Sequence, residues 1–148
     1  MAGKRFNGLN VGDKFLTPGK TVTDTHVTTF VGLGGYLAPF FLDEEYAKGT
    51  VFGGRVVPGR VTVLLMGGLV EQAEIFDLDG LIAMLGLDKV RVQAPLRIGD
   101  TIKVEVEITE KRLTSKGDRG IIVHTERCFN QRGEMVAELE GTHLLKLG

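Results

Sequence analysis

The second half of the chain alternates between apolar and polar residues, as a half-buried β-strand does. From 101 to 109 the alternation holds at every position, which predicts a strand with one face against a core. Similar β-rich runs cover 81–92, 120–129 and 134–147, and the 130–133 segment has the composition of a tight hairpin turn. Together these runs predict a meander of long antiparallel strands.

The first half of the chain shows helical spacing instead. A helix is predicted to begin at Thr23 or Asp24, either of which is a good N-cap residue, and to end at Gly34-Gly35. The acidic run that starts at Asp43 predicts a second, short helix ending near Lys48, because carboxylates are favoured in a first turn.

A third helix is predicted from Pro58 or Gly59 to about Ala73, since proline is favoured in the first turn of a helix. No charged residue lies between Arg60 and Glu71, and a helix that is apolar on all sides is expected to be buried. One long buried helix beside antiparallel strands predicts an α+β fold in which the sheet wraps around the helix. The 148 residues are expected to form a single domain, 1–148.

Composition narrows the function classes. The formal net charge of -1, without a basic run or a series of stacking aromatics, argues against nucleic-acid binding. The single cysteine, Cys128, excludes an internal disulfide, and the longest apolar stretch, 61–70, is too short to span a bilayer. The histidines, of which His143 lies on an apolar strand face, form no cluster with metal-ligand spacing. We therefore expect a cytoplasmic protein without a bound metal or membrane contact.

Three segments carry a resemblance to a known family. Gly35–Asp43, continuing as Glu45-Tyr46-Ala47, is similar to the pattern Gly-Asp-x-Asn-Pro-x-His-x-Asp followed by Glu-Tyr-Ala. Phe52–Gly59 is similar to an apolar pair and a His-Gly step before a central helix, and Ala94–Thr101 is close to Pro-Val-x-x-Gly-Asp-Thr. In this order the segments resemble the MaoC-like dehydratases, which include the (R)-specific enoyl-CoA hydratases. The resemblance implies a hot-dog fold, an antiparallel sheet wrapped around a long central helix.

The resemblance also implies a chemistry. In that family, the motif aspartate and histidine hold one water, which adds to the β-carbon of a trans-enoyl thioester, while an amide at the helix start polarises the thioester oxygen. Here Tyr36 stands at the aspartate position, Ala38 at the asparagine position and Phe41 at the histidine position, whereas Gly59 is retained. Phe41 cannot transfer a proton, and a tyrosine with its reference pKa of about 10 is a poor base at neutral pH. The water-activating pair is therefore expected to be missing.

Thioester binding is expected to persist at Val57, Pro58 and Gly59, with Ala38 and Phe41 beside them. Two further residues have open roles. Tyr36 either fills the former site or supplies a hydroxyl for catalysis or ligand orientation.

Arg60, in the first turn of a helix that carries no further charge before Glu71, either pairs with Asp43 or Glu44, or lies exposed, or clamps a carboxylate or thioester oxygen. Arg55 is a weaker candidate for the same anion-binding role. Asp43 is explained by capping the short helix.

Three functions remain open. The first is an acyl-CoA or acyl-carrier-protein hydratase or dehydratase with a degenerate active site, which uses no cofactor beyond the thioester itself. The second is a non-catalytic acyl-CoA-binding subunit, because some hot-dog dehydratases are heteromers in which one chain lacks the catalytic pair. The third is a hot-dog thioesterase, for which no carboxylate is clearly placed on the central helix. In each case we expect a dimer or higher oligomer, since exposed strand edges favour pairing between subunits.

Overall fold

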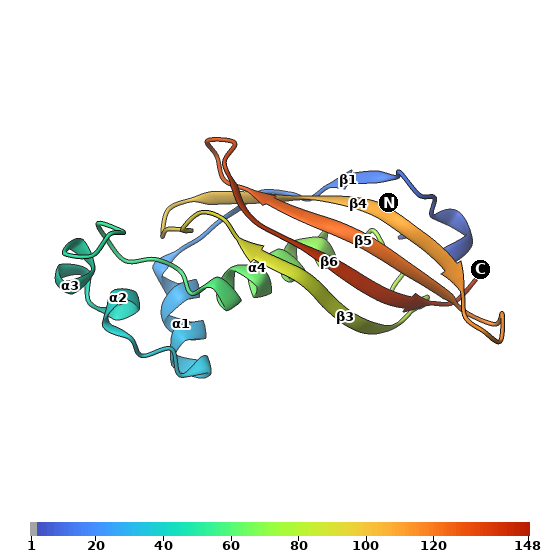
Figure 1. The fold of residues 1–148 in the computed structure, drawn as a ribbon, viewed down its shortest axis with the longest axis horizontal. Coiled ribbons are helices and arrows are strands. Elements are labelled where there is room, and N and C mark those ends of the chain that lie inside the picture. Colours follow the sequence, from blue (N-terminus) through green and yellow to red (C-terminus); the bar gives the residue numbers. More distant parts are fainter. Residues whose placement is uncertain (1–2) are drawn as a thin grey trace.

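The computed structural model describes residues 3–148, which form one antiparallel sheet with a long helix packed against it (Figure 1). The helices are α1 (Asp24–Gly34), α2 (Pro39–Leu42), α3 (Glu44–Lys48) and α4 (Gly59–Gln72), preceded by a single 3-10 turn, η1 (Phe6–Gly8). The strands are β1 (Lys14–Leu16), β2 (Lys20–Thr21), β3 (Leu81–Val92), β4 (Thr101–Leu113), β5 (Gly120–Phe129) and β6 (Met135–Leu145).

The sheet follows the order β1-β4-β5-β6-β3, and the short strand β2 also pairs with β4. The predicted meander is confirmed for β4, β5 and β6, which are antiparallel neighbours. It is wrong for β3, which pairs with β6 at the far edge rather than with β4, the strand that follows it. The connection 93–100 therefore crosses from one edge strand to the far side of two others, and no local pattern indicates such a crossing.

The alternation of apolar and polar residues is reproduced as alternating burial. In β4, the apolar residues at every second position from Ile102 to Ile108 have no exposed surface. In β5, every second residue from Gly120 is buried, and His124 lies on that buried face together with Ile122. The buried residues of neighbouring strands thus share one face of the sheet, and this face lies against α4.

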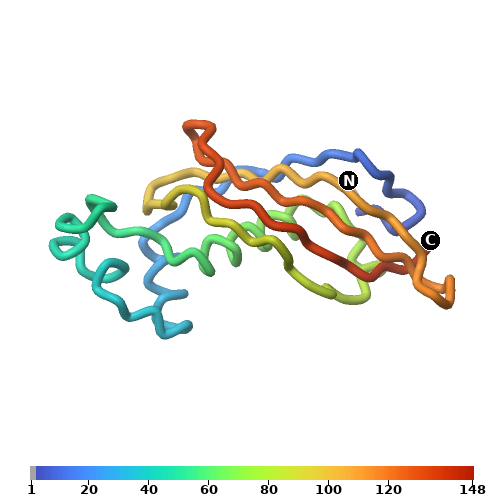
Figure 2. The backbone as a smooth tube through the Cα atoms, viewed as in Figure 1, coloured from blue at the N-terminus to red at the C-terminus, as the bar shows by residue number. Residues whose placement is uncertain are grey.

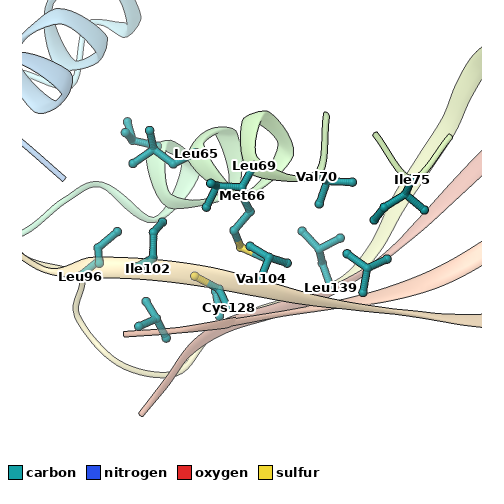
Figure 3. Packing of buried hydrophobic residues seen from close by; sticks show 14 of the residues in the cluster. Leu65, Met66, Leu69, Val70, Ile75, Leu96, Ile102, Val104, Cys128 and Leu139 are labelled. Atoms are coloured by element: carbon teal, nitrogen blue, oxygen red, sulfur yellow. The ribbon is translucent and has the colours of Figure 1, made fainter. Parts of the chain in front are cut away.

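Helix α4 packs on the buried face of the sheet (Figure 3). Met66 extends from α4 toward Val104 and Cys128, and Leu69 lies beside it; none of the four has more than a trace of exposed surface.

Burial, reinforced by the charge of Glu126, raises the pKa of the Cys128 thiol to about 12. Cys128 is therefore a small core residue whose thiol stays protonated at neutral pH.

Helix α4 is buried on one side only, and the prediction that it is buried all round is wrong for the single chain. Leu64 is 52% exposed, and Gly67 and Gly68 on the same side are also exposed. The reason is geometric, since one sheet reaches only one face of a helix. The edge strand β3 continues this open surface with apolar side chains such as Met84, which is 58% exposed.

The small helices gather at one end of the molecule, beyond the N-terminus of α4 and opposite the two chain ends (Figures 1 and 2). Thr23 is the N-cap of α1, where its hydroxyl accepts a hydrogen bond from the His26 amide, and Gly35 ends the helix in a left-handed conformation. Asp43 caps α3 by accepting a hydrogen bond from the Tyr46 amide at 2.9 Å. Both capping predictions are confirmed.

Candidate functional site

A hollow of about 360 Å³, here called the first hollow, lies at the N-terminal end of α4. It is built by α2, by the loop that leads into α4, and by the connection that follows β3. The residues that line it are Phe40, Phe41, Phe52, Val56, Val57, Gly59, Val92, Gln93, Ala94, Pro95 and Leu96. Gln93 carries the one polar side chain in this lining, and none of the lining side chains ionises.

The start of α4 has amide groups without helical partners beside this hollow. Pro58 is the N-cap, and its carbonyl accepts the first helical hydrogen bonds, from the amides of Val61 and Thr62. The Gly59 amide therefore lies outside the helical pattern, at the positive end of the helix dipole. A Cβ at Gly59 would stand only 3.2 Å from Cγ2 of Val92, so glycine allows the helix to begin this close to β3.

A second hollow, of about 400 Å³, adjoins the first on the other side of the α4 N-terminus. The residues that line it are Phe30, Leu33, Gly34, Tyr36, Arg60, Val61 and Leu64. The rings of Tyr36 and Phe41 meet edge to face with centroids 6.4 Å apart, and Phe41 in turn contacts Phe40 at 4.3 Å. An aromatic cluster therefore stands between the two hollows.

The predicted site residues are divided between these hollows. Val57, Gly59 and Phe41 line the first, whereas Tyr36 and Arg60 line the second. Their roles as ligand-binding or catalytic residues remain predictions.

Two of the predicted residues line neither hollow. Pro58 is buried under the helix start, and Ala38 is the N-cap of α2. The lining residues that sequence reasoning did not single out, such as Phe52 and Gln93, lie within or just before the motif segments. The motif segments could therefore have identified these lining residues from the sequence.

Arg60 does not pair with Asp43 or Glu44. Glu44 is instead bound to Arg55, with 2.9 Å between Glu44 Oε2 and Arg55 Nε, and Arg55 also contacts Asp24 at 3.1 Å. Arg60 is exposed at the helix start, which was one of the alternatives, and it has no carboxylate partner within residues 3–148. The expected anion-binding role of Arg55 is weakened, because two acids already neutralise it.

A buried polar cluster lies under the C-terminal end of α4. His124 Nε2 is 2.9 Å from Glu126 Oε1, and the His124 and His143 rings stack with centroids 5.1 Å apart. Burial, and secondarily the neighbouring His124, lowers the pKa of His143 to about 4, so this imidazole is neutral at pH 7. Because residues two apart on a strand share a face, the His124-Glu126 spacing was a signal for this pair.

A third hollow, of about 160 Å³, touches this cluster. It is lined by Glu71 of α4 together with Glu126, His143 and apolar residues of α4, β3 and β6. A carboxylate of the central helix thus does face a hollow, at the end of α4 opposite the first hollow. Nowhere in the described part of the chain do three or more His, Cys, Asp or Glu side chains form a group suited to a metal ion.

No helix within residues 3–148 is both long enough and apolar enough to cross a membrane.

Comparison with known proteins agrees with this geometry. The family model of the MaoC like domain matches residues 7–126. The chain is 34% identical over 129 residues to protein MaoC of Klebsiella aerogenes, covering 87% of this chain and 37% of that protein. It is 31% identical over 90 residues to the (R)-specific enoyl-CoA hydratase of Rhodospirillum rubrum, covering 61% of this chain and 60% of that enzyme. The chain therefore spans less than two thirds of the length of these curated relatives.

Solved structures give the same result for the whole chain. A monoamine oxidase regulatory protein from Archaeoglobus superposes with a TM-score of 0.92 at 30% identity, covering 100% of this chain and 97% of that one. A Mycobacterium tuberculosis protein with a double hot-dog fold superposes with a TM-score of 0.80 at 19% identity, covering 99% of this chain and 45% of that one. The predicted α+β hot-dog fold is thereby confirmed.

Proposed function

The chain belongs to the MaoC-like family of acyl-thioester hydratases and dehydratases, and from this premise we propose that it binds an acyl thioester in the first hollow without itself activating water for hydration. The observation that carries the proposal is the lining of that hollow, which combines an apolar wall with the Gly59 amide and contains no ionisable side chain.

Binding and hydration make different demands on this site. An apolar wall accommodates an acyl chain, and an unsatisfied amide at a helix N-terminus stabilises negative charge on a thioester oxygen. Hydration of an enoyl thioester also requires a proton acceptor and a proton donor within hydrogen-bond reach of one water. Phe41, at the position that resembles the family histidine, supplies neither.

Tyr36 is the one residue that supports catalysis by this chain instead. Its hydroxyl can donate a proton, but it lines the second hollow, with Phe41 standing between it and the first. A hydratase that relies on Tyr36 is therefore the second candidate function.

A heteromer with a catalytic homologue is a third arrangement, in which the partner supplies the water-activating pair. Self-association, a single domain over 1–148 and a cytoplasmic location stay predictions.

The test has two measurements on the purified chain. Isothermal titration with hexanoyl-CoA is expected to show binding, and crotonyl-CoA is expected to be hydrated no faster than the background reaction, followed by loss of enoyl absorbance. Absence of binding would exclude the proposal. Enzymatic hydration that disappears in Tyr36→Phe, a variant that differs by one oxygen atom, would establish the second candidate function.

A further inference from the structure

Some arginines of this chain form ion pairs with carboxylates and others do not. Most of them have a carboxylate partner, including Arg5, Arg112 and Arg127. Within residues 3–148, Arg60, Arg91 and Arg97 form no ion pair. Arg97 is the one whose side chain reaches across the edge of the first hollow.

Arg97 connects two walls of that hollow. Its side chain donates a hydrogen bond from Nη2 to the carbonyl oxygen of Phe52, and Phe52 and Leu96 both line the hollow. Its backbone amide donates to Asp100 Oδ2 at 3.0 Å, which fixes the turn that carries it. The guanidinium is therefore held at the rim, half-buried, by partners of which the only one on its side chain is a neutral carbonyl.

Glu44 lies near Arg97 without forming an ion pair with it. A Cβ on the buried residue Gly54 would stand 3.3 Å from Glu44 Oε1 and 3.5 Å from Arg97 Nη1, so Gly54 leaves an opening between these two groups. Glu44 nevertheless forms its ion pair with Arg55, through Oε2. The guanidinium of Arg97 thus borders this opening with N–H groups that no carboxylate neutralises, whereas the charge of Glu44 on the other side is balanced by Arg55. A planar guanidinium with free N–H groups suits an oxyanion.

Thioester carriers bring such an oxyanion to a fixed place on the molecule. In coenzyme A and in acyl-carrier protein alike, the thiol ends a pantetheine arm whose other end is a phosphate. We propose that Arg97 binds this pantetheine phosphate, so that the first hollow selects phosphorylated carriers over simple thioesters. The inference rests on the proposed binding of acyl thioesters in the first hollow.

The alternative role of Arg97 is purely structural, as a brace that holds Phe52 in place. If Arg97 only braces Phe52, then its removal loosens the rim and weakens every thioester ligand equally. If it binds phosphate, the loss is confined to ligands that carry phosphate.

The experiment measures dissociation constants for hexanoyl-pantetheine, hexanoyl-4′-phosphopantetheine and hexanoyl-CoA by isothermal titration. The native chain is expected to bind phosphopantetheine about tenfold or more tightly than pantetheine, as a charge-assisted hydrogen bond provides. Arg97→Gln, which removes the charge and keeps a shorter polar side chain, is expected to lose about tenfold in affinity for both phosphorylated probes relative to pantetheine. A further preference for hexanoyl-CoA that survives in Arg97→Gln would assign extra contacts to the nucleotide.

Arg112→Gln is the matched control, because Arg112 pairs with Glu110 near the far end of β4 and is not part of either hollow. It is expected to bind all three probes as the native chain does. Arg97→Lys keeps the charge and is expected to retain most of the preference, which also guards against a folding defect in Arg97→Gln.

Equal weakening of all three probes in Arg97→Gln would assign Arg97 to bracing and overturn the inference. The same holds if the native chain does not distinguish phosphopantetheine from pantetheine. Failure of the native chain to bind any of the three probes would instead refute the proposed function itself.

Discussion

At the scale of single residues, one glycine controls the position of the Tyr36 ring. A Cβ on Gly34 would stand 2.6 Å from Cε2 of Tyr36, whereas a Cβ on Gly32 of the same helix would have no neighbour within 4 Å. Gly34→Ala is therefore expected to displace the ring from the second hollow. Gly32→Ala is expected only to stabilise the chain, by up to about 1 kcal/mol, because alanine is the better helix former.

Near-ultraviolet circular dichroism checks this prediction, since the chain has no tryptophan and only two tyrosines, Tyr36 and Tyr46. Gly34→Ala is expected to change the tyrosine band and to lack the gain in thermal midpoint shown by Gly32→Ala. Identical spectra and midpoints for the two variants would show that the ring is not held where the structure places it.

Residue-scale prediction from the sequence succeeded where the interaction is local. Thr23 and Asp43 cap helices through amides three residues away, so a short pattern identifies them. Of the alternatives for Arg60, the ion pair with Asp43 or Glu44 is not formed, because Glu44 is bound to Arg55, an interaction set by how the loop before α4 folds back on α3. Tyr36 and Phe41 were selected by resemblance, yet the pattern did not indicate that they line separate hollows.

At the scale of elements, the pairing of β5 with β6 stacks two imidazoles in the core. The pKa of His143 is lowered to about 4, chiefly by burial, with His124 as the second cause. His143 therefore takes up its proton near pH 6.5 in the unfolded chain, but only near pH 4 in the folded chain. The free energy of unfolding is expected to fall as the pH drops through this window, by up to about 3 kcal/mol for the full shift.

The variant His143→Phe tests this linkage, because a phenyl ring can keep the contact with Phe76, whose ring centroid lies 5.0 Å away. Urea unfolding between pH 8 and pH 4 is expected to give a flatter dependence for the variant below pH 6.5. Above pH 7 the two curves are expected to run parallel. An unchanged slope below pH 6.5 would mean that Glu126, Glu71 or His124, the other ionisable groups at this cluster, govern the dependence.

The elements themselves could be predicted to different degrees. The long strands and α4 followed from periodicity, because each must bury a continuous apolar face. The short strands β1 and β2 and the helix α2 were missed, since two to four residues carry too little pattern. The place of β3 at the sheet edge depends on a crossing that only packing decides.

At the scale of the whole molecule, the surface made by the open side of α4 and the edge strand β3 carries exposed apolar side chains, and Gly67 of α4 and Met84 of β3 both line the third hollow there. Leu64 is 52% exposed on α4 and Met84 is 58% exposed on β3, where the outer edge of the strand is unpaired within the described chain. We predict that a second subunit covers this surface, because an edge strand with apolar side chains is prone to pairing.

Leu64→Glu and Met84→Glu are each expected to convert the oligomer to a monomer, measured by light scattering after size-exclusion chromatography. Leu113→Glu is the matched control, since Leu113 on β4 is also 52% exposed but lies outside this surface. Its oligomeric state is expected to match that of the native chain. A native chain that is monomeric at micromolar concentration would contradict the prediction.

The charge-free stretch of α4 between Arg60 and Glu71 fits this view of the whole molecule. Periodicity indicated a helix apolar on every side, yet the single chain buries only one side of it. Such a sequence is expected if a second subunit covers the side of α4 that the single chain leaves open.

The first described residues of the chain lie beside its last residue. Arg5 donates a hydrogen bond from Nη1 to the carbonyl oxygen of Gly148 at 2.8 Å, and this end of the molecule lies opposite the small helices beside the first and second hollows (Figure 2). A tether attached at either end would therefore hold the chain on a sensor surface with its hollows turned outward. For the same reason, a short peptide joining the ends would allow a circular permutant whose new termini open at the β4–β5 turn.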